Sequence, residues 1–255
     1  MRAQSPVILA VERSVCGCDY GGTSWTTRDE ADRIRALLEL RPGLRLLELG
    51  AGSGWPGLYL SKASGCDIAL VDLPLAGLRI AAERAAKERL RGACWVAVAD
   101  GAGLPFRDAS LDAVSHSDVL CCLREKRAVL EACRRVIRGG GRMVFSVISV
   151  APALSAADYS RAVANGPEFV ESDTDYPTLL AQTGWTALDC QNLTMGFAAS
   201  CRRLLRAEEE RKDALQALLG AAEFGERQAG WRSKLAALED GLLRRELFVA
   251  RPDSA

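Results

Sequence analysis

The sequence predicts an α/β fold built around a mostly parallel sheet with helices on both faces. Two observations lead to this prediction. Between residues 44 and 150, short apolar runs alternate with longer segments of helical periodicity, which is typical of βαβ units. The apolar runs are also nearly continuous, as expected for strands that are buried on both faces.

Five strands and three helices are expected in this block. The strands are 44–49, 67–72, 93–98, 111–116 and 142–148, and the helices between them are 56–63, 75–90 and 125–137. The glycines at 139–141 are expected to stop the last helix before a central strand.

The flanking segments have a different character. Residues 28–40 form an amphipathic helix pattern, and Thr27 with Glu30 fits a capping box at its start. After residue 150 we expect short helices and a loop at 155–184, a strand at 185–193, charged helix at 197–240 and a closing strand at 242–250. These patterns predict one domain with three parts: an N-terminal cap (1–27), a core (28–150) and a C-terminal part with a helical insertion on the substrate side (151–255).

Composition and charge narrow the possible partners. The 255 residues include 33 Lys and Arg, 33 Asp and Glu, and one histidine, which gives zero formal net charge. A protein that neutralises many phosphates usually has a basic excess, so no nucleic-acid partner is expected. The longest apolar run, 93–99, is far shorter than the ~20 residues of a membrane span. With no recognisable signal peptide, the sequence predicts a cytoplasmic protein without a membrane partner.

Nine cysteines occur without a disulfide-framework spacing. A cytosolic chain of this length does not need such crosslinks, so reduced and mostly packed thiols are expected. Because the chain has one histidine and no C-x-x-C pair, no metal site is expected.

A glycine-rich turn follows the first expected strand. Gly50, Gly52 and Gly54 stand between this strand and the next helix, where glycines permit a tight turn and the helix N-terminus offers free N–H groups to a ligand. The dinucleotide fingerprint counted from Gly50 would need glycine at position 55, which is Trp55. A shifted match at Gly52, Gly54 and Gly57 begins two residues later. A dehydrogenase is therefore disfavoured.

Two acids at later strand ends favour an adenosine-containing ligand. Asp72 ends the second strand, 22 residues after Gly50, where a carboxylate can accept hydrogen bonds from ribose hydroxyls. Asp100 and Gly101 follow the third strand, where a carboxylate can accept from an adenine amino group. Either acid alone could cap a helix or lie in a solvated turn, but the ordered set predicts nucleoside binding.

These segments resemble the motifs of the class I S-adenosylmethionine-dependent methyltransferases. The resemblance covers about residues 20–150, in family order, through ELGAGSG at 48–54, VDLP at 71–74, ADGAGLPFRDASLDAV at 99–114, SDVLCCL at 117–123 and LEACRRVIRGGGRMVFSVI at 130–148. It is strongest for the small-molecule branch with the ubiquinone-type, sarcosine and phosphoethanolamine methyltransferases. It implies a Rossmann-like seven-stranded sheet in the order 3-2-1-4-5-7-6, with the last strand antiparallel.

The resemblance to the phosphoethanolamine enzymes extends to residues 24–40 and 230–252, with two departures. Residues 165–176 contain four acids and neither Arg nor Lys, and Cys122 stands where several relatives place a histidine. A phosphate-binding role for this lid region is therefore in doubt.

The resemblance also implies which residues contact S-adenosylmethionine. Glu48, Gly50, Ala51, Gly52 and Gly54 would form the floor beneath the methionine moiety. Asp72 would hold the ribose and Leu73 would flank the adenine, whose edge would meet Asp100 and Gly101. The remaining contacts would come from the N-terminal cap and the end of the fourth strand: Ser24, Trp25, Thr26 and Ser117.

Three residues are candidates for chemistry on the acceptor. His116 is the only imidazole and could act as a base near pH 7, or it could be a structural strand-end residue. Asp118 could orient an amine or hydroxyl, or cap a helix. Tyr20 could cover the transferable methyl, or be a plain surface aromatic.

Two further groups have both a functional and an ordinary interpretation. Thiols at 16, 18, 121 and 122 could bind a thiophilic substrate, although packed or idle thiols are the usual case. The acids Glu168, Glu171, Asp173 and Asp175 could attract a cationic amine or form a solvated loop.

The predicted function is transfer of a methyl group from S-adenosylmethionine to an N, O or C nucleophile of a small molecule. Two alternatives on the same fold remain at this stage: an RNA or protein methyltransferase, and a non-catalytic S-adenosylmethionine-binding regulator.

Overall fold

A computed structural model describes residues 2–22 and 24–253. Residues 1 and 23 of the expected N-terminal cap lie outside the described part. The centre is a sheet of β1 (Arg45–Leu49), β2 (Asp67–Asp72), β3 (Cys94–Val98), β4 (Leu111–Ser117), β5 (Ile137–Val150), β6 (Trp185–Asn192) and β7 (Leu243–Pro252). The order is β3-β2-β1-β4-β5-β7-β6, and β7 runs antiparallel to both of its neighbours. The Rossmann-like fold class and the strand order expected from the sequence are both confirmed.

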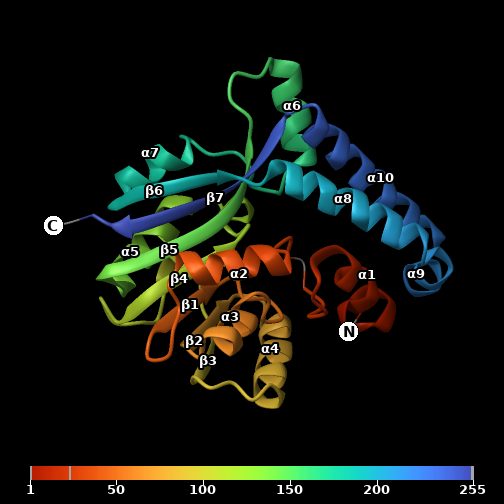
Figure 1. Ribbon diagram of the computed structural model, residues 1–255. Coiled ribbons are helices and arrows are strands. Elements are labelled where there is room, and N and C mark those ends of the chain that lie inside the picture. The colour runs from red at the N-terminus through yellow and green to blue at the C-terminus, as the bar shows by residue number, and fades with distance from the viewer. Residues whose placement is uncertain (1, 23, 254–255) are drawn as a thin grey trace.

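Helices cover both faces of the sheet (Figure 1). On one face, α2 (Arg28–Leu37), α3 (Gly57–Ser64) and α4 (Leu75–Lys87) pack on the strands through apolar residues of one core cluster. On the other face, α5 (Lys126–Val136) and α7 (Tyr176–Gln182) build a second cluster around β4 and β5. Because the central strands are buried from both sides, their sequences are almost continuously apolar.

A helical layer stands beside the carboxyl ends of the parallel strands, on the right of Figure 1. It consists of α1 (Pro6–Cys16), α8 (Thr194–Glu209), α9 (Lys212–Leu219) and α10 (Ala221–Glu239), with α6 (Ala156–Asn165) against α10. The helix α1 packs on α8, although almost two hundred residues separate them in the sequence. The N-terminal segment and the C-terminal insertion thus lie on the same side of the sheet.

Two local features of the structure differ from those expected from the sequence. The glycines at 139–141 lie inside β5 rather than ending a helix, and a bulge between Leu111 and Ala113 accommodates them. A Cβ on Gly141 would lie 2.6 Å from the carbonyl oxygen of Asp112, so only glycine fits there. The helix α1 was not expected, although Pro6 at its first turn and Gly17 after its end, with φ +74°, are ordinary helix boundary signals.

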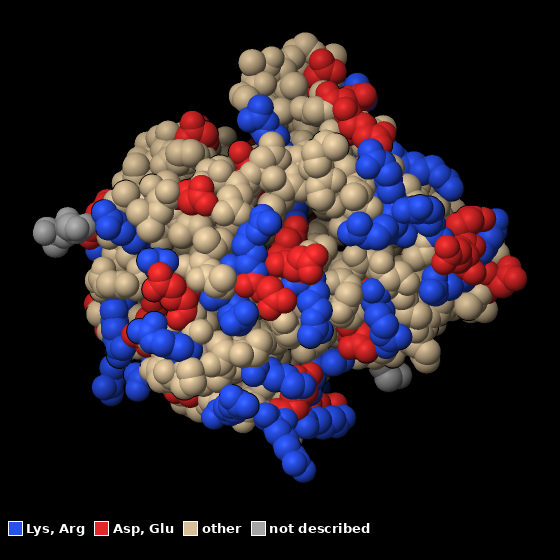
Figure 2. Space-filling model, viewed as in Figure 1, with Lys and Arg blue, Asp and Glu red and all other residues tan. Residues whose placement is uncertain are grey.

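The expected capping box is confirmed: the Thr27 side chain accepts from the Glu30 N–H, and the Glu30 side chain accepts from the Thr27 N–H. All nine cysteines are free thiols. Among residues 2–22 and 24–253, no helix is long and apolar enough to cross a bilayer. Charges of both signs are interspersed over the face shown in Figure 2, so on this face the zero net charge does not hide two opposite patches.

Candidate cofactor and acceptor site

The glycine turn leaves β1 at Leu49 and leads into α3. Gly50, Gly52 and Gly54 have φ values of +68°, +49° and +102°, a region that side chains with a Cβ rarely adopt. A Cβ on Gly50 would lie 2.4 Å from Cγ2 of Val119, whereas a Cβ on Gly52 would meet nothing within 4 Å. The turn is therefore tightly packed at its start and open at its centre, where a ligand could approach the backbone.

Asp72 holds this turn from the neighbouring strand. Its Oδ2 accepts a hydrogen bond from the N–H of Gly52 at 2.8 Å, and its Oδ1 accepts from the N–H of Leu73 at 2.8 Å. Ala51 is tied to the same strand, because its N–H donates to the carbonyl oxygen of Val71 at 3.1 Å. The carboxylate thus orders the turn and still has lone pairs for a ligand hydroxyl.

The third strand end contributes Asp100 and Gly101. Oδ1 of Asp100 accepts from the N–H of Ala102 at 2.9 Å and caps the short 3₁₀ helix Gly101–Gly103. Leu73, at the end of β2, is 54% exposed. The exposed apolar side chain of Leu73 could cover the face of a nucleobase. The nearby carboxylate of Asp100 could accept a hydrogen bond from the edge of the base.

The end of the N-terminal segment reaches the same region. The carbonyl oxygen of Thr26 accepts from Nε1 of Trp55 at 2.7 Å, directly after the glycine turn, and Oγ of Ser24 accepts from the Thr26 N–H. The ring of Trp25 packs against those of Phe197 and Trp231, with centroids 5.0 Å apart in both pairs. These contacts join the segment before α2 to the helical layer.

Several buried oxygen atoms on β1, β4 and the adjoining loops have no hydrogen-bond partner among the described residues. They are Oγ1 of Thr26, Oε2 of Glu48, and Oγ of Ser53, Ser115 and Ser117. Burial raises the pKa of Glu48 to about 8, and the neighbouring Ser115 hydroxyl lowers it by less. Unpaired buried polar atoms are costly in a folded protein, so these oxygens are candidate partners for a polar ligand.

Comparisons with known proteins agree with this geometry. Residues 47–145 match the family model described as a methyltransferase domain. A demethylmenaquinone methyltransferase of Corynebacterium glutamicum is 30% identical over 189 residues, which cover 66% of this chain and 78% of the relative. The chain belongs to the class I S-adenosylmethionine-dependent methyltransferases.

Other relatives extend the likeness over nearly the whole chain. A phosphoethanolamine N-methyltransferase of Triticum aestivum is 24% identical over 244 residues, which cover 95% of this chain but 47% of that protein. The chain thus spans about half the length of the plant relatives that it matches. A solved structure of phosphoethanolamine N-methyltransferase 2 of Haemonchus contortus, in complex with phosphomonomethylethanolamine and S-adenosylhomocysteine, has a TM-score of 0.81 at 19% identity and covers 99% of this chain and 59% of that chain. This likeness shows a shared fold.

The residues of the described chain fit the cofactor of its family, S-adenosylmethionine. A nucleoside needs a hydroxyl acceptor and an apolar face, which Asp72 and Leu73 offer, and an amino acid needs polar partners, which the buried oxygens offer. The open centre of the turn at Gly52 leaves the space between them.

At the end of β4, Asp118 has a partner that the sequence analysis did not include. Nε of Arg245, on β7, donates to both carboxylate oxygens of Asp118 at 3.1 and 3.0 Å, and Nη1 donates to Oε1 of Glu30 at 2.9 Å. Asp118 therefore neither caps a helix nor points freely toward an acceptor. Strand alternation could have pointed to Arg245, which shares its side of β7 with the buried Leu243 and Leu247.

His116 lies in a setting that opposes a role as a base. It is fully buried and stacks on Phe145 with ring centroids 4.7 Å apart, and neither ring nitrogen has a partner among the described residues. Burial lowers its pKa to about 3, so the ring stays neutral at physiological pH. Burial and the low pKa thus favour the structural interpretation of His116 over that of a base titrating near pH 7.

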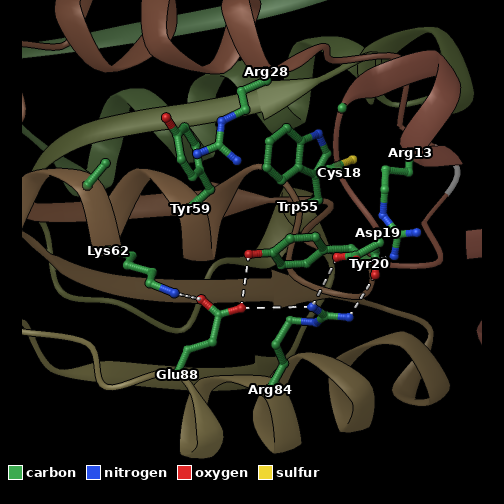
Figure 3. Close-up of a pocket in the computed structure, with 12 residues that line it drawn as sticks. Arg13, Cys18, Asp19, Tyr20, Arg28, Trp55, Tyr59, Lys62, Arg84 and Glu88 are labelled. Carbon is green, nitrogen blue, oxygen red and sulfur yellow. Dashed lines mark hydrogen bonds and ion pairs between the residues drawn. The ribbon is translucent and has the colours of Figure 1, made fainter. Parts of the chain in front are cut away.

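Tyr20 lines a groove of about 550 Å³ between the N-terminal segment, α3 and α4. Its ring lies next to Trp55 (Figure 3). Its hydroxyl donates to Oε1 of Glu88 at 3.2 Å, and the guanidinium of Arg84 stacks 4.1 Å from its ring. Through these two contacts, Tyr20 connects the N-terminal segment to α4 and the residue that follows it.

Three of the four lid acids lie near the thiols at 121 and 122: Asp173 and Glu171 act on the Lys126 ammonium together with these thiols, and Glu168 acts on the Cys122 thiol. Asp175 caps α7 through the N–H of Thr178, and Glu171 accepts from the Tyr159 hydroxyl, so two of the four acids have structural partners. Cys121 and Cys122 lie beside Asp118, where a hydrogen bond with Cys121 lowers the pKa of Cys122 to about 7. Within the described chain, no cluster of three or more His, Cys, Asp or Glu could hold a metal ion.

Proposed function

We propose that the protein transfers the methyl group of S-adenosylmethionine to a nitrogen, oxygen or carbon nucleophile of a small molecule. The observation that carries this proposal is the group of partnerless buried oxygens around an open glycine turn held by Asp72. The small-molecule class is supported by the relatives, which include a quinone-precursor and a phosphoethanolamine methyltransferase.

In this proposal, the cofactor-binding residues are those singled out from the sequence. Asp72 accepts from the ribose, Leu73 covers the adenine, and Asp100 with Gly101 meets its edge. The turn from Glu48 to Gly54 supports the methionine moiety, which also meets the segment Ser24, Trp25 and Thr26. Ser117 approaches from the end of β4. Neutral Glu48 can donate as well as accept at neutral pH, because its pKa is raised to about 8.

When bound, S-adenosylmethionine would supply an electrophilic methyl on a positively charged sulfur, which would keep the electron pair of the methyl–sulfur bond as the acceptor's lone pair forms the new bond. The chain's part is to hold the acceptor in line and to exclude water, which can contribute roughly 7–11 kcal/mol. No step uses His116, which is buried and neutral; an acceptor that arrives deprotonated needs no base.

We also propose that residues 1–27 and 151–240 together cover the acceptor. The packing of α1 on α8 and of Trp25 on Phe197 and Trp231 supports this, since it brings both segments to the carboxyl edge of the sheet. A cytoplasmic location is part of the same proposal, and the free thiols, which persist in reducing compartments, support it.

Isothermal titration with S-adenosylmethionine, S-adenosylhomocysteine and NAD tests the cofactor assignment, with Asp72→Ala as the binding-deficient comparison. We expect both S-adenosyl compounds to bind and NAD not to bind. Binding of NAD alone would overturn the proposal. A methyl-labelled cofactor assayed with amines, phenols, quinols, total RNA and a protein extract then separates the acceptor classes, and label transfer only to RNA or protein would contradict the small-molecule acceptor.

A further inference from the structure

The ion cluster behind the end of β4 has an unbalanced charge. Arg245 has a guanidinium between two carboxylates, Asp118 on one side and Glu30 on the other, and it also donates to Oγ of Ser146 at 3.3 Å. The side chains of Arg245, Asp118 and Glu30 are 1%, 10% and 13% exposed. Two carboxylates and one guanidinium leave a formal charge of −1 in a largely buried place.

Further charged groups near Asp118 do not cancel this excess. Lys234 and Glu168 act on the Cys122 thiol together with Asp118, and Glu246 acts on the Tyr176 hydroxyl together with Asp118. One of these three groups is a cation and two are anions, so their formal charges sum to −1. The neighbourhood of the triad Asp118–Arg245–Glu30 therefore keeps a net negative charge.

The triad borders the glycine turn. Asp118 comes directly before Val119, whose Cγ2 would lie 2.4 Å from a Cβ on Gly50. Glu30 belongs to the capping box that follows Thr26, and the Thr26 carbonyl is bound to Trp55. Both carboxylates thus stand on segments that adjoin the turn, one on each side of Arg245.

A buried charge is poorly screened by solvent ions and acts over several ångströms. The methyl donor carries a sulfonium cation, whereas the product S-adenosylhomocysteine has a neutral thioether of nearly the same shape. A net negative charge beside the turn therefore stabilises the donor complex and does not stabilise the product complex.

We propose that the triad Asp118–Arg245–Glu30 discriminates the charged methyl donor from its neutral product, and so favours exchange of product for donor after each turnover. This inference rests on the proposed function, because it needs the sulfonium to lie near the end of β4. In it, Asp118 and Glu30 act through charge, and Arg245 is a positioning residue that holds both carboxylates.

The test is the ratio of the dissociation constant for S-adenosylhomocysteine to that for S-adenosylmethionine, measured by isothermal titration. Asp118→Asn and Glu30→Gln each bring the triad to neutrality, and the amide oxygen introduced by Glu30→Gln can still accept from the Thr27 N–H in the capping box. We expect the ratio to fall about tenfold in each variant, the order expected for loss of one nearby charge in a protein-like dielectric.

Two further variants separate charge from structure. Glu208→Gln removes a fully buried carboxylate that is paired with Arg227 on the helical layer, and it should leave the ratio unchanged. Arg245→Lys retains the triad's charge while it loses the fork geometry, so it should weaken the binding of both ligands with little change in the ratio. A purely structural role of the triad would lower both affinities together in every variant.

A ratio within twofold of the wild-type value in both Asp118→Asn and Glu30→Gln would overturn the inference, and if one variant fails to fold, the other decides. That outcome would leave the proposed function standing, because the wild-type protein would still bind the cofactor. Failure of wild-type protein to bind either ligand would instead contradict the proposed function.

Discussion

At the carboxyl end of β2, Asp72 accepts from two main-chain N–H groups within the adjoining turns, whereas at the end of β4, Asp118 is bound by a guanidinium from β7. The first arrangement involves only residues 52–73, and the sequence motif in this stretch is enough to predict it. The second joins positions 30, 118 and 245 and forms only when α2, β4 and β7 come together. The Asp72 arrangement is thus set by a short stretch of chain, whereas the Asp118 arrangement depends on long-range packing.

The largest effect is expected from a substitution in the glycine turn, which Asp72 holds in place. Gly50→Ala places a Cβ 2.4 Å from Val119 Cγ2 at a φ of +68°. Left-handed strain of roughly 1–2 kcal/mol and overpacking of roughly 1–3 kcal/mol should destabilise the fold, and the displaced turn should lower S-adenosylmethionine affinity more than about 100-fold. Urea unfolding and isothermal titration measure the two effects. Gly43→Ala, at a φ of +87° with nothing within 4 Å, should show the strain alone and bind normally.

Asp72→Asn tests the carboxylate itself. Asparagine has a single acceptor oxygen, so the N–H of either Gly52 or Leu73 loses its partner, as does a ribose hydroxyl. At roughly 1.5–3 kcal/mol for hydrogen bonds to a charged group, cofactor affinity should fall about 10- to 100-fold. Asp67→Asn is the matched control, since Asp67 accepts from the Ala93 N–H at the opposite end of the same strand. Equal losses in both variants would show that Asp72 has only a structural role.

The pH dependence of the stability of His116→Phe tests whether the buried imidazole is neutral in the native state. The native pKa of about 3 lies below the unfolded value of about 6.5. The unfolded state therefore binds a proton that the native state does not, and the stability contributed by neutral His116 is lost as pH falls from about 6.5 to 3. Relative to wild type, the phenylalanine variant should be more stable at pH 4 than at pH 7 by about 3 kcal/mol.

The stability contributed by Glu48 changes with pH in the opposite direction. Its native pKa of about 8 lies above the unfolded value of about 4.5, so the native state retains a proton and stability falls as pH rises from about 4.5 to 8. Urea unfolding of His116→Phe and Glu48→Gln across pH 4–8 separates the two contributions, because each variant removes one titrating group and keeps the other. The pH dependence of methyl transfer should be unchanged in His116→Phe; loss of one limb of that profile would restore His116 as a base.

The smallest effect is expected at the N-terminal segment. Tyr20→Phe removes the half-buried hydrogen bond to Glu88, which is worth about 0.5–1.5 kcal/mol, and cofactor affinity should change less than about threefold. Tyr59→Phe, whose hydroxyl contacts Asp32 in the same groove, is the control. A tenfold or larger drop in turnover for Tyr20→Phe alone would show that Tyr20 does cover the methyl during catalysis.

The fold was predictable because its signals are local. The apolar runs of β1 and β2, the capping box at Thr27 and the glycines at a strand end each follow from spacing within a few residues. The strand order followed from resemblance to a family and is confirmed. The glycines at 139–141 were misplaced because a bulge that absorbs them depends on the facing Asp112, which belongs to another strand.

The sequence by itself determined the glycine turn, the carboxylate at the end of β2 and the family, because backbone conformation and residue type suffice to specify them. Only the tertiary structure decided that His116 is buried and neutral, that Tyr20 binds α4, and that Asp118 shares Arg245 with Glu30. The physical reason is that a titratable side chain takes its charge state and partner from whatever packs against it, and those neighbours come from distant parts of the chain.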